Sequence, residues 1–229
     1  QTTQGCEWSR CAFCFHVFPN RAFLSKSPEK TQREMASLSR ATRIREFDLA
    51  NLATPIQVLE SMLPHWRRMR MRWRALVRVH PGFTPAFARK LNAAGCTFLS
   101  FGLETADTDG LKRLRKGIAL EMVDANLRAC AEAGLNVGIF TLNYPGQTEA
   151  EFVRTLEFCV ERRRLLADLG VNRFKMGRWM ESAGNLVGRI APETARDLNS
   201  FDVPYIGEGV SLERYNQLRM KAEEAVNGR

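Results

Sequence analysis

Residues 73–104 read WRALVRVHPGFTPAFARKLNAAGCTFLSFGLE, and this stretch sets the pattern for most of the chain. Its two ends, residues 73–79 and 97–103, are short apolar runs that are typical of buried strands. Thr84 followed by Pro85 predicts the start of a helix between them, and Gly95 predicts its end. Because a helix separates the two strands, we expect them to be parallel and joined by a right-handed crossover.

The same alternation continues in both directions along the chain. Further apolar runs, which predict strands, occupy residues 44–49, 136–144 and 171–176. The helix signals between them are Ser27-Pro28, Thr54-Pro55, a capping box at residues 148–151, and a Val123, Leu127 and Cys130 stripe that stops at Gly134. Pro64 predicts a kink or an early end in the helix that follows Thr54. This α/β alternation favours a partial or full barrel of parallel strands, with its chemistry at the carboxyl ends of the strands.

The composition excludes several classes of protein. The chain has 229 residues, of which 45% are hydrophobic, but no apolar run approaches the roughly 18 residues of a membrane span, so we expect no membrane partner. The formal net charge is +9, and five arginines fall within residues 67–74. Such a cluster is typical either of a solvated helix end or of a surface that attracts a polyanion.

Six cysteines are distributed unevenly. Cys96, Cys130 and Cys159 lie in apolar segments and are expected to be buried thiols, and a disulfide framework does not suit a chain of this kind. The other three lie in the stretch GCEWSRCAFC, residues 5–14. Free thiols and a metal cluster predict a reducing, cytoplasmic location.

The cysteine loop, residues 5–14, is the strongest chemical signal. Thiolates of Cys6, Cys11 and Cys14 suit an iron–sulfur cluster or zinc. Structural zinc requires four ligands, and His16 is a candidate for the fourth. Three cysteines on a single loop instead favour a cluster that keeps one iron free of protein ligands, as a catalytic centre needs.

The loop, the alternating strands and several strand ends resemble the radical S-adenosylmethionine enzymes. This resemblance spans roughly residues 5–176 and implies a partial (βα)6 barrel of the TIM type over residues 1–180. Cys6, Cys11 and Cys14 would hold a [4Fe-4S] cluster that reductively cleaves S-adenosylmethionine to a 5′-deoxyadenosyl radical. Residues 181–229 are then expected to form an irregular segment and a C-terminal helix, over residues 211–226, that packs on the barrel.

Four residues are identified by this resemblance as contacts of the organic cofactor. Phe13 corresponds to the aromatic position near adenine, and Glu104, in Gly-Leu-Glu-Thr, to the acid that bonds the ribose hydroxyls. Arg78 is a candidate partner of the cofactor carboxylate, and Asn143 opens the turn Asn-Tyr-Pro-Gly-Gln-Thr. Residues 111–117 resemble a Leu-x-x-x-x-Lys-Gly segment of the family. No catalytic acid, base or radical relay is assigned.

The chain also departs from the family pattern. Its loop spacing is Cys-x4-Cys-x2-Cys, one residue longer than usual, and Asn51 stands where an acidic residue is common. Asn143 and Gln147 replace a Gly and a Glu. Only five residues precede Cys6, so we expect a truncated first strand and an exposed edge on the strand at residues 44–49.

The combination is most similar to the subgroup that carries an upstream cobalamin-binding domain, so cobalamin is a possible further cofactor. The implied partners are a small-molecule or peptide substrate and a reductant such as flavodoxin or ferredoxin. One alternative is an RNA-modifying member of the family, suggested by the basic cluster. Another is an iron–sulfur or zinc module that is not catalytic.

Overall fold

A five-stranded parallel sheet forms the centre of the computed structural model, which describes residues 1–14, 22–177, 189–190, 202–203, 205–206 and 209–228. The strand order follows the chain order, and each strand pairs with the next in parallel register. The strands are β3 (Glu46–Thr54), β4 (Arg72–Val77), β5 (Cys96–Glu104), β6 (Asn136–Asn143) and β7 (Asp168–Arg173). The predicted α/β fold with parallel strands is confirmed.

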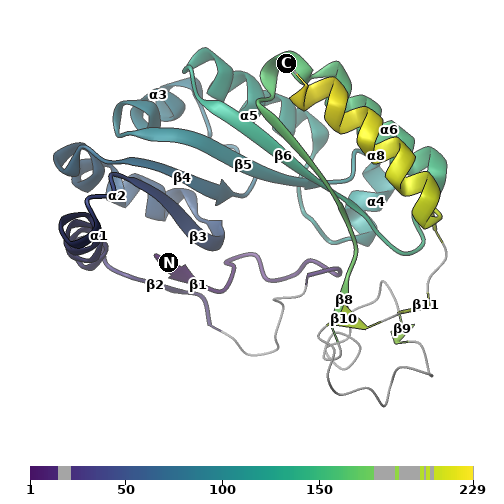
Figure 1. The fold of residues 1–229 in the computed structure, drawn as a ribbon, viewed down its shortest axis with the longest axis horizontal. Coiled ribbons are helices and arrows are strands. Elements are labelled where there is room, and N and C mark those ends of the chain that lie inside the picture. Colours follow the sequence, from purple (N-terminus) through teal and green to yellow (C-terminus); the bar gives the residue numbers. More distant parts are fainter. Residues whose placement is uncertain (15–21, 178–188, 191–201, 204, 207–208, 229) are drawn as a thin grey trace.

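Helices connect these strands and cover one side of the sheet (Figure 1). They are α1 (Pro28–Thr42), α2 (Ile56–Met69), α3 (Pro85–Ala93), α4 (Thr108–Arg113), α5 (Leu120–Glu132), α6 (Glu149–Glu161), the short 3-10 helix η1 (Arg163–Leu165) and α8 (Leu212–Asn227). The N-terminal segment lies on the other side of the sheet, and its strand β1 (Thr3–Gln4) pairs with β2 (Leu24–Ser25). Four further two-residue strands are β8 (Met176–Gly177), β9 (Arg189–Ile190), β10 (Asp202–Val203) and β11 (Tyr205–Ile206).

Polar side chains cap the helices where the sequence predicts it. The hydroxyl oxygens of Ser27 and Thr84 each accept a hydrogen bond, 3.2 Å long, from the backbone N–H three residues later. Thr148 and Glu151 form the reciprocal capping box, with hydrogen bonds of 3.2 and 2.9 Å. These bonds satisfy N–H groups that have no partner within the helix, so they define where each helix begins.

One prediction in the region around β3 is wrong, and one of the two alternatives predicted for Pro64 is excluded. Thr54 does not cap α2, because it is the last residue of β3 and its hydroxyl accepts a hydrogen bond from Asn51 instead. The helix also does not end early at Pro64, since it continues to Met69. The missing hydrogen bond of a proline is offset here by burial. Trp66 is fully buried and stacks on Trp73 of β4, with ring centroids 3.9 Å apart.

The predicted strand boundaries shift at the two edges of the sheet. The strand expected at residues 44–49 begins two residues later and continues to Thr54, while Ile44 is half exposed. The strand expected at residues 171–176 begins at Asp168. Most of the segment expected to be irregular, between residues 181 and 205, lies outside the described residues, as do His16, Arg178 and Trp179. The C-terminal helix is confirmed over Leu212–Asn227, with Ser211 as its cap.

The N-terminal segment meets the edge of β3 at Asn51, while Glu46, Asp48 and Ala50 of the same strand stay exposed. Asn51 accepts hydrogen bonds from the backbone N–H groups of Thr2 (2.9 Å) and Thr3 (3.1 Å) and donates to the Thr2 hydroxyl (2.7 Å). The N-terminal segment therefore lies along β3 without joining it as a regular strand. Asn51, which the sequence analysis noted only as a departure from the family pattern, is the residue that attaches this segment.

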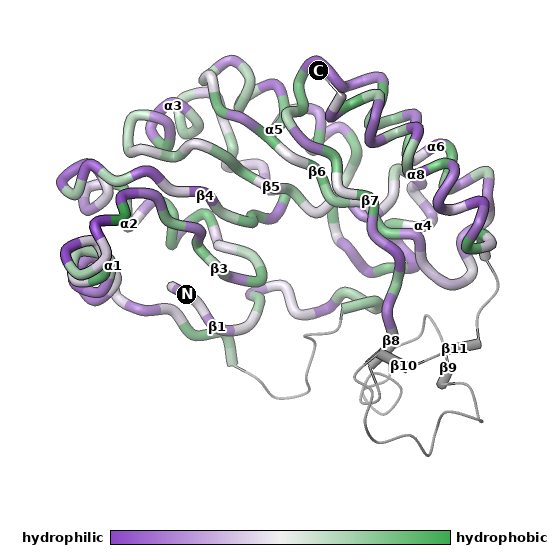
Figure 2. The backbone as a smooth tube through the Cα atoms, viewed as in Figure 1, coloured by the Kyte–Doolittle hydropathy of each residue, from purple (hydrophilic) through white to green (hydrophobic). Residues whose placement is uncertain are grey.

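The core lies between the sheet and its helices. Its largest fully buried side chains come from α2, β4, α3, β5, the turn after α4, α5, β6 and α6. Figure 2 shows α6 and α8 alternating between hydrophobic and hydrophilic residues along their turns, as helices with one face on the sheet must. Within the described part of the chain, no helix is long and apolar enough to cross a membrane.

Candidate functional site

The cysteine loop lies beside the turn that follows α4, at the carboxyl ends of the strands (Figure 1). The Ala12 N–H donates to the Leu114 carbonyl at 2.9 Å, and the Trp8 indole N–H donates to the Arg115 carbonyl at 2.8 Å. Inside the loop, the Cys14 N–H donates to the Cys11 carbonyl at 3.2 Å. The loop is therefore anchored on both sides of Cys11 to residues 114–115, which belong to the segment resembling Leu-x-x-x-x-Lys-Gly.

Trp8 packs tightly between a glycine and an arginine. Gly117 has a φ of +64°, and a Cβ placed there would lie 2.3 Å from the Trp8 ring, which only glycine avoids. The Arg78 guanidinium lies on the Trp8 ring, with the guanidinium carbon Cζ 4.2 Å from the ring centroid. Arg78 also donates to the carbonyls of Lys116 and Gly117. Arg78, Trp8 and Gly117 thus join the end of β4, the cysteine loop and the turn after α4.

Glu104 and Lys116 form an ion pair below the loop. Their atoms Oε1 and Nζ are 2.7 Å apart, and the two side chains are only 13% and 10% exposed. Glu104 is the last residue of β5 and has a φ of +71°, a conformation that costs energy for a residue with a Cβ. The Lys116 ammonium also faces the ring of Phe13, 5.6 Å from its centroid. Lys116 therefore joins two residues that the family resemblance had assigned to the cofactor.

The thiol of Cys11 is held in its protonated form by its surroundings. Burial raises the pKa of Cys11 to about 11, and neighbouring Cys14 and Glu104 act in the same direction, whereas Lys116 and Arg78 oppose the rise. Burial lowers the pKa of Arg78, against the attraction of Cys11 and Cys6. A metal ion or cluster removes the thiol proton by direct coordination, so the two cations beside Cys11 fit a loop whose thiolates bind metal.

The three loop cysteines are partly exposed and form no disulfide. In the part of the chain that the structure describes, no three side chains among His, Cys, Asp and Glu are arranged as a metal site. The sulfur atoms are thus placed on one anchored loop without being gathered around a common point. The donor set of three thiols on one loop, with cations nearby, fits an iron–sulfur cluster.

Asn143 lies apart from this group. It ends β6, next to β5, and is buried, and its amide donates to the Gln147 side-chain oxygen at 3.0 Å. The Gln147 amide nitrogen is fully buried and has no hydrogen-bond partner among the described residues, so a donor is present at this turn. No contact joins Asn143 to Phe13, Arg78 or Glu104 among the described residues, so the structure brings together three of the four predicted cofactor residues.

The sequence did not predict the role of Lys116, which was noted only within the Leu-x-x-x-x-Lys-Gly segment. Trp8 was expected to be a packing residue, and its contacts with Gly117 and Arg78 confirm this. The glycine after Lys116 was the available signal, because a Lys-Gly pair directly after a short helix indicates a close approach of the backbone. Nothing in the sequence indicated that Trp8 would be the group that approaches.

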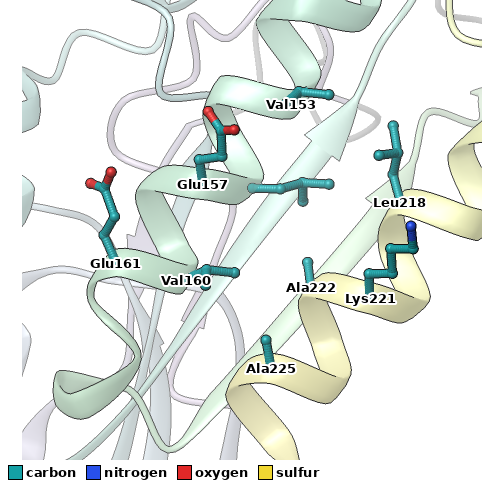
Figure 3. Close-up of a pocket in the computed structure, with 9 residues that line it drawn as sticks. Val153, Glu157, Val160, Glu161, Leu218, Lys221, Ala222 and Ala225 are labelled. Carbon is teal, nitrogen blue, oxygen red and sulfur yellow. The ribbon is translucent and has the colours of Figure 1, made fainter.

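A concave surface lies on the outside of the molecule, away from the cysteine loop. It is a groove of about 460 Å³ between α6 and α8, lined by Val153, Leu156, Glu157, Val160, Glu161, Leu218, Lys221, Ala222 and Ala225 (Figure 3). The lining is mostly aliphatic, with charged groups at the rim, and none of the predicted site residues takes part. We therefore place the candidate site at the cysteine loop.

Known proteins are similar to this chain in sequence and in fold. Residues 1–159 match the model of the Radical SAM superfamily. The chain is 30% identical over 211 residues to a ribosomal protein uS12 methylthiotransferase, RimO, of Salinispora arenicola, with 84% of this chain and 40% of the relative covered. A second RimO, from Heliobacterium modesticaldum, is 26% identical over 184 residues, with 69% of this chain and 37% of the relative covered. The chain spans about two fifths of the curated relatives it matches.

Solved structures show the same architecture. The radical S-adenosylmethionine methyltransferase TsrM from Kitasatospora setae, with cobalamin and a [4Fe-4S] cluster bound, has a TM-score of 0.66 at 19% identity and covers 80% of this chain and 37% of its own. The cobalamin-dependent enzyme OxsB has a TM-score of 0.61 at 20% identity and covers 74% of this chain and 27% of its own. At these identities the likeness concerns the fold alone. With its parallel sheet, its anchored cysteine loop and a family match over residues 1–159, the chain belongs to the Radical SAM superfamily.

Proposed function

We propose that this chain is the core of an enzyme that cleaves S-adenosylmethionine reductively. Cys6, Cys11 and Cys14 would hold a [4Fe-4S] cluster, which supplies the single electron that converts S-adenosylmethionine into methionine and a 5′-deoxyadenosyl radical. The observation that carries this proposal is the anchoring of the cysteine loop on the turn that also positions Lys116 against Glu104. An electron-carrying module that does not bind S-adenosylmethionine has no need of the ion pair between Lys116 and Glu104.

The protein residues have separate tasks in this proposal. Glu104 presents a carboxylate that accepts hydrogen bonds from the ribose hydroxyls, and Lys116 holds that carboxylate in place and offsets its charge. Phe13 offers an apolar ring to the adenine. Asn143 and the free amide of Gln147 present hydrogen-bond donors at the next strand end.

Arg78 has two tasks in this scheme. Its bonds to the carbonyls of Lys116 and Gly117 hold the turn after α4, and its charge faces Cys6 and Cys11. It remains our candidate for the cofactor carboxylate, since a guanidinium carries five N–H donors and can serve more than one acceptor.

The test is cluster reconstitution without oxygen, followed by reduction with dithionite in the presence of S-adenosylmethionine and chromatographic assay of 5′-deoxyadenosine. We expect a brown protein that forms this product. Cys11→Ala should abolish the product and reduce the iron content. The matched control is Cys130→Ala, which removes a buried thiol of α5 far from the loop and should leave both unchanged.

Two results would contradict the proposal. A colourless protein that contains zinc would show a structural metal site. A brown protein that makes no 5′-deoxyadenosine, even when extended to the length of the relatives, would show a cluster without radical chemistry.

Glu104→Gln and Lys116→Met test the ion pair within the site. Each is expected to raise the KM for S-adenosylmethionine by about 10-fold or more, because neutralising one partner leaves an unpaired charge in a largely buried site. The iron content should be unchanged, since neither residue is a ligand. Loss of iron in these variants would show that the ion pair stabilises the cluster and does not bind S-adenosylmethionine.

The relatives suggest what the enzyme does next. Their names describe transfer of a methyl or methylthio group, so we propose group transfer to a small-molecule or peptide substrate, with cobalamin if the whole protein has an upstream domain for it. Incubation with S-adenosylmethionine labelled in its methyl group tests this, because transfer moves the label to the substrate.

We also propose a reducing, cytoplasmic setting and a partner such as flavodoxin or ferredoxin that delivers the electron. The six free cysteines support the setting. We keep residues 1–180 as the catalytic unit and residues 181–229 as a segment packed on it. The contacts of α8 with α6 and β7 support the packing.

A further inference from the structure

Seven arginines gather at the amino-terminal edge of β3 and β4, the end of the sheet opposite the cysteine loop. We call this group the arginine edge; it consists of Arg40, Arg43, Arg45, Arg67, Arg68, Arg70 and Arg72. The topology brings them together, because α1 ends just before β3, α2 ends just before β4, and the two helices pack side by side (Figure 1). The Arg72 N–H donates to the Arg45 carbonyl at 2.9 Å, which joins the two strand starts.

The side chains of the arginine edge are not neutralised by the protein. All seven residues are exposed, and none of their guanidinium groups forms an ion pair or hydrogen bond with any residue that the structure describes. Arg74, the next outward residue of β4, pairs with Asp48 at 3.1 Å. Glu46, opposite Arg72 in the β3–β4 register, is the acidic neighbour on this edge. A strongly positive surface therefore remains.

Two members of the arginine edge occupy strained backbone positions. Arg43 (φ +63°) and Arg70 (φ +51°) end α1 and α2 in the left-handed conformation, where a Cβ crowds the following carbonyl. In the turns after α3 and α5, the left-handed residue is glycine, Gly95 (φ +88°) and Gly134 (φ +70°). Of the five helix-to-strand connections, two thus use a left-handed glycine, two a left-handed arginine, and the one after α6 uses no left-handed residue.

Helix-end electrostatics do not account for this choice. A cation near the last carbonyls of a helix is favourable, but Arg40 already serves α1, and Arg67 and Arg68 already serve α2. An additional arginine in the strained position adds charge where the helix does not need it. The pattern is explained if an external anion binds there.

We propose that the arginine edge binds the phosphate backbone of a nucleic acid. Seven of the exposed cations at this end of the sheet are arginines, and the planar guanidinium, unlike an ammonium, binds phosphate with two parallel hydrogen bonds. An anionic membrane attracts lysine and arginine alike as point charges. Because this surface faces away from the cysteine loop, the bound nucleic acid is a scaffold that the protein holds, and the chemistry takes place elsewhere. The inference does not require the proposed reaction.

The test uses the whole chain, without reconstitution, and a fluorescein-labelled single-stranded RNA of mixed sequence. Fluorescence anisotropy gives the Kd at several KCl concentrations. The Arg43→Gly/Arg70→Gly variant removes two charges and relieves two strained residues, so its thermal midpoint should equal or exceed that of the wild type. If two phosphate contacts are lost, the slope of log K against log salt falls by about 1.4, and the Kd at 0.1 M KCl rises by about 25-fold.

The matched control is Arg128→Gln/Lys221→Gln, which removes two exposed charges from α5 and α8. It should change the Kd by less than about 2-fold, since charges far from the contact act only weakly through salt. The proposal would be overturned if both variants bound RNA equally more weakly than the wild type, or if the wild type did not bind RNA in 0.05 M KCl. Preferential binding to phosphatidylserine vesicles that RNA does not displace would also overturn it, because that result assigns the surface to a membrane.

Discussion

Trp8 and Gly117 depend on each other at the scale of single residues. The indole ring occupies the space that a Cβ at residue 117 would need, and its N–H reaches the Arg115 carbonyl. A close contact of this kind is specific, because the ring can neither be enlarged nor moved without displacing the loop between Cys6 and Cys11. The cysteine loop is therefore positioned by its packing as well as by its ligands.

Gly117→Ala is expected to displace the loop and to impair metal loading. The new Cβ would lie 2.3 Å from the Trp8 ring, whereas Gly146→Ala, at a similar φ of +79°, meets no atom within 4 Å. Both variants bear the strain of a left-handed residue, about 1–2 kcal/mol, but only Gly117→Ala should lose iron rapidly to a chelator after reconstitution. Adding Trp8→Ala to Gly117→Ala should restore part of the protein's ability to retain iron against the chelator. No difference between the two glycine variants would contradict the role of Trp8.

The ion pair between Asp124 and Arg162 gives a pH-dependent stability. Two hydrogen bonds of 2.5 and 3.0 Å from Arg162 lower the pKa of Asp124 below its usual value. A lowered pKa in the folded state stabilises the protein above the unfolded pKa of about 3.9, and this contribution is lost as the pH falls through the folded value. Asp124→Asn should thus lower the unfolding free energy by about 1 kcal/mol at pH 7 and by much less at pH 3. A constant difference across that range, measured by chemical denaturation, would show that the pair does not titrate in this way.

The turns between helix and strand are the elements that repeat in this fold. Each helix must end, reverse and deliver the chain to the amino-terminal edge of the sheet, and after α1, α2, α3 and α5 a left-handed residue makes this turn. Gly95 is needed for a second reason, because a Cβ there would lie 2.1 Å from the Met71 carbonyl oxygen. At Gly134 the nearest atom to such a Cβ is 3.5 Å away.

Gly95→Ala and Gly134→Ala are therefore expected to differ, although both residues follow helix ends. Gly134→Ala should cost about 1–2 kcal/mol, the strain of a left-handed alanine. Gly95→Ala should cost clearly more, because the start of β4 must also move away from the new methyl group. Denaturant unfolding of the two variants checks this. Equal losses would mean that the Met71 backbone adjusts freely.

At the scale of the whole molecule, the open sheet has two edges, and side-chain hydrogen bonds hold a neighbouring segment against each of them. Asn51 attaches the N-terminal segment along β3. On β7, three residues of α8 serve the outer backbone groups. Asn227 bonds both the N–H and the carbonyl of Leu169, at 2.8 and 3.1 Å. The Val171 N–H donates to Glu223 at 3.2 Å, and its carbonyl accepts from Tyr215 at 2.8 Å. A helix thus takes the place of a neighbouring strand, which protects the edge from pairing with other chains.

Asn227→Ala tests this covering directly. It should speed amide hydrogen exchange at Leu169, whose N–H loses its partner, while exchange at Val171 stays slow because Glu223 still accepts its hydrogen bond. The Val171 amide is thus an internal control within the same strand. Equal acceleration at both positions would show that α8 is released as a unit, and no change at either would show that the side-chain bonds do not protect β7.

The sequence alone determined the alternation of helices and strands, most helix caps and the cysteine loop, because these depend on residues close together in the chain. Ser27, Thr84 and Thr148 cap their helices as predicted, since each bond spans three residues. Only the tertiary structure decided which distant groups meet. Asn51 was assigned by its place after a strand but holds the N-terminus, and α2 continues through Pro64 because Trp66 and Trp73 stack across it. Lys116 reaches Glu104, and Trp8 reaches Gly117, only once the turn after α4 lies under the loop. The physical reason is that local bonds are encoded by spacing, whereas such contacts depend on how the packed elements bring remote side chains within a few ångströms of one another.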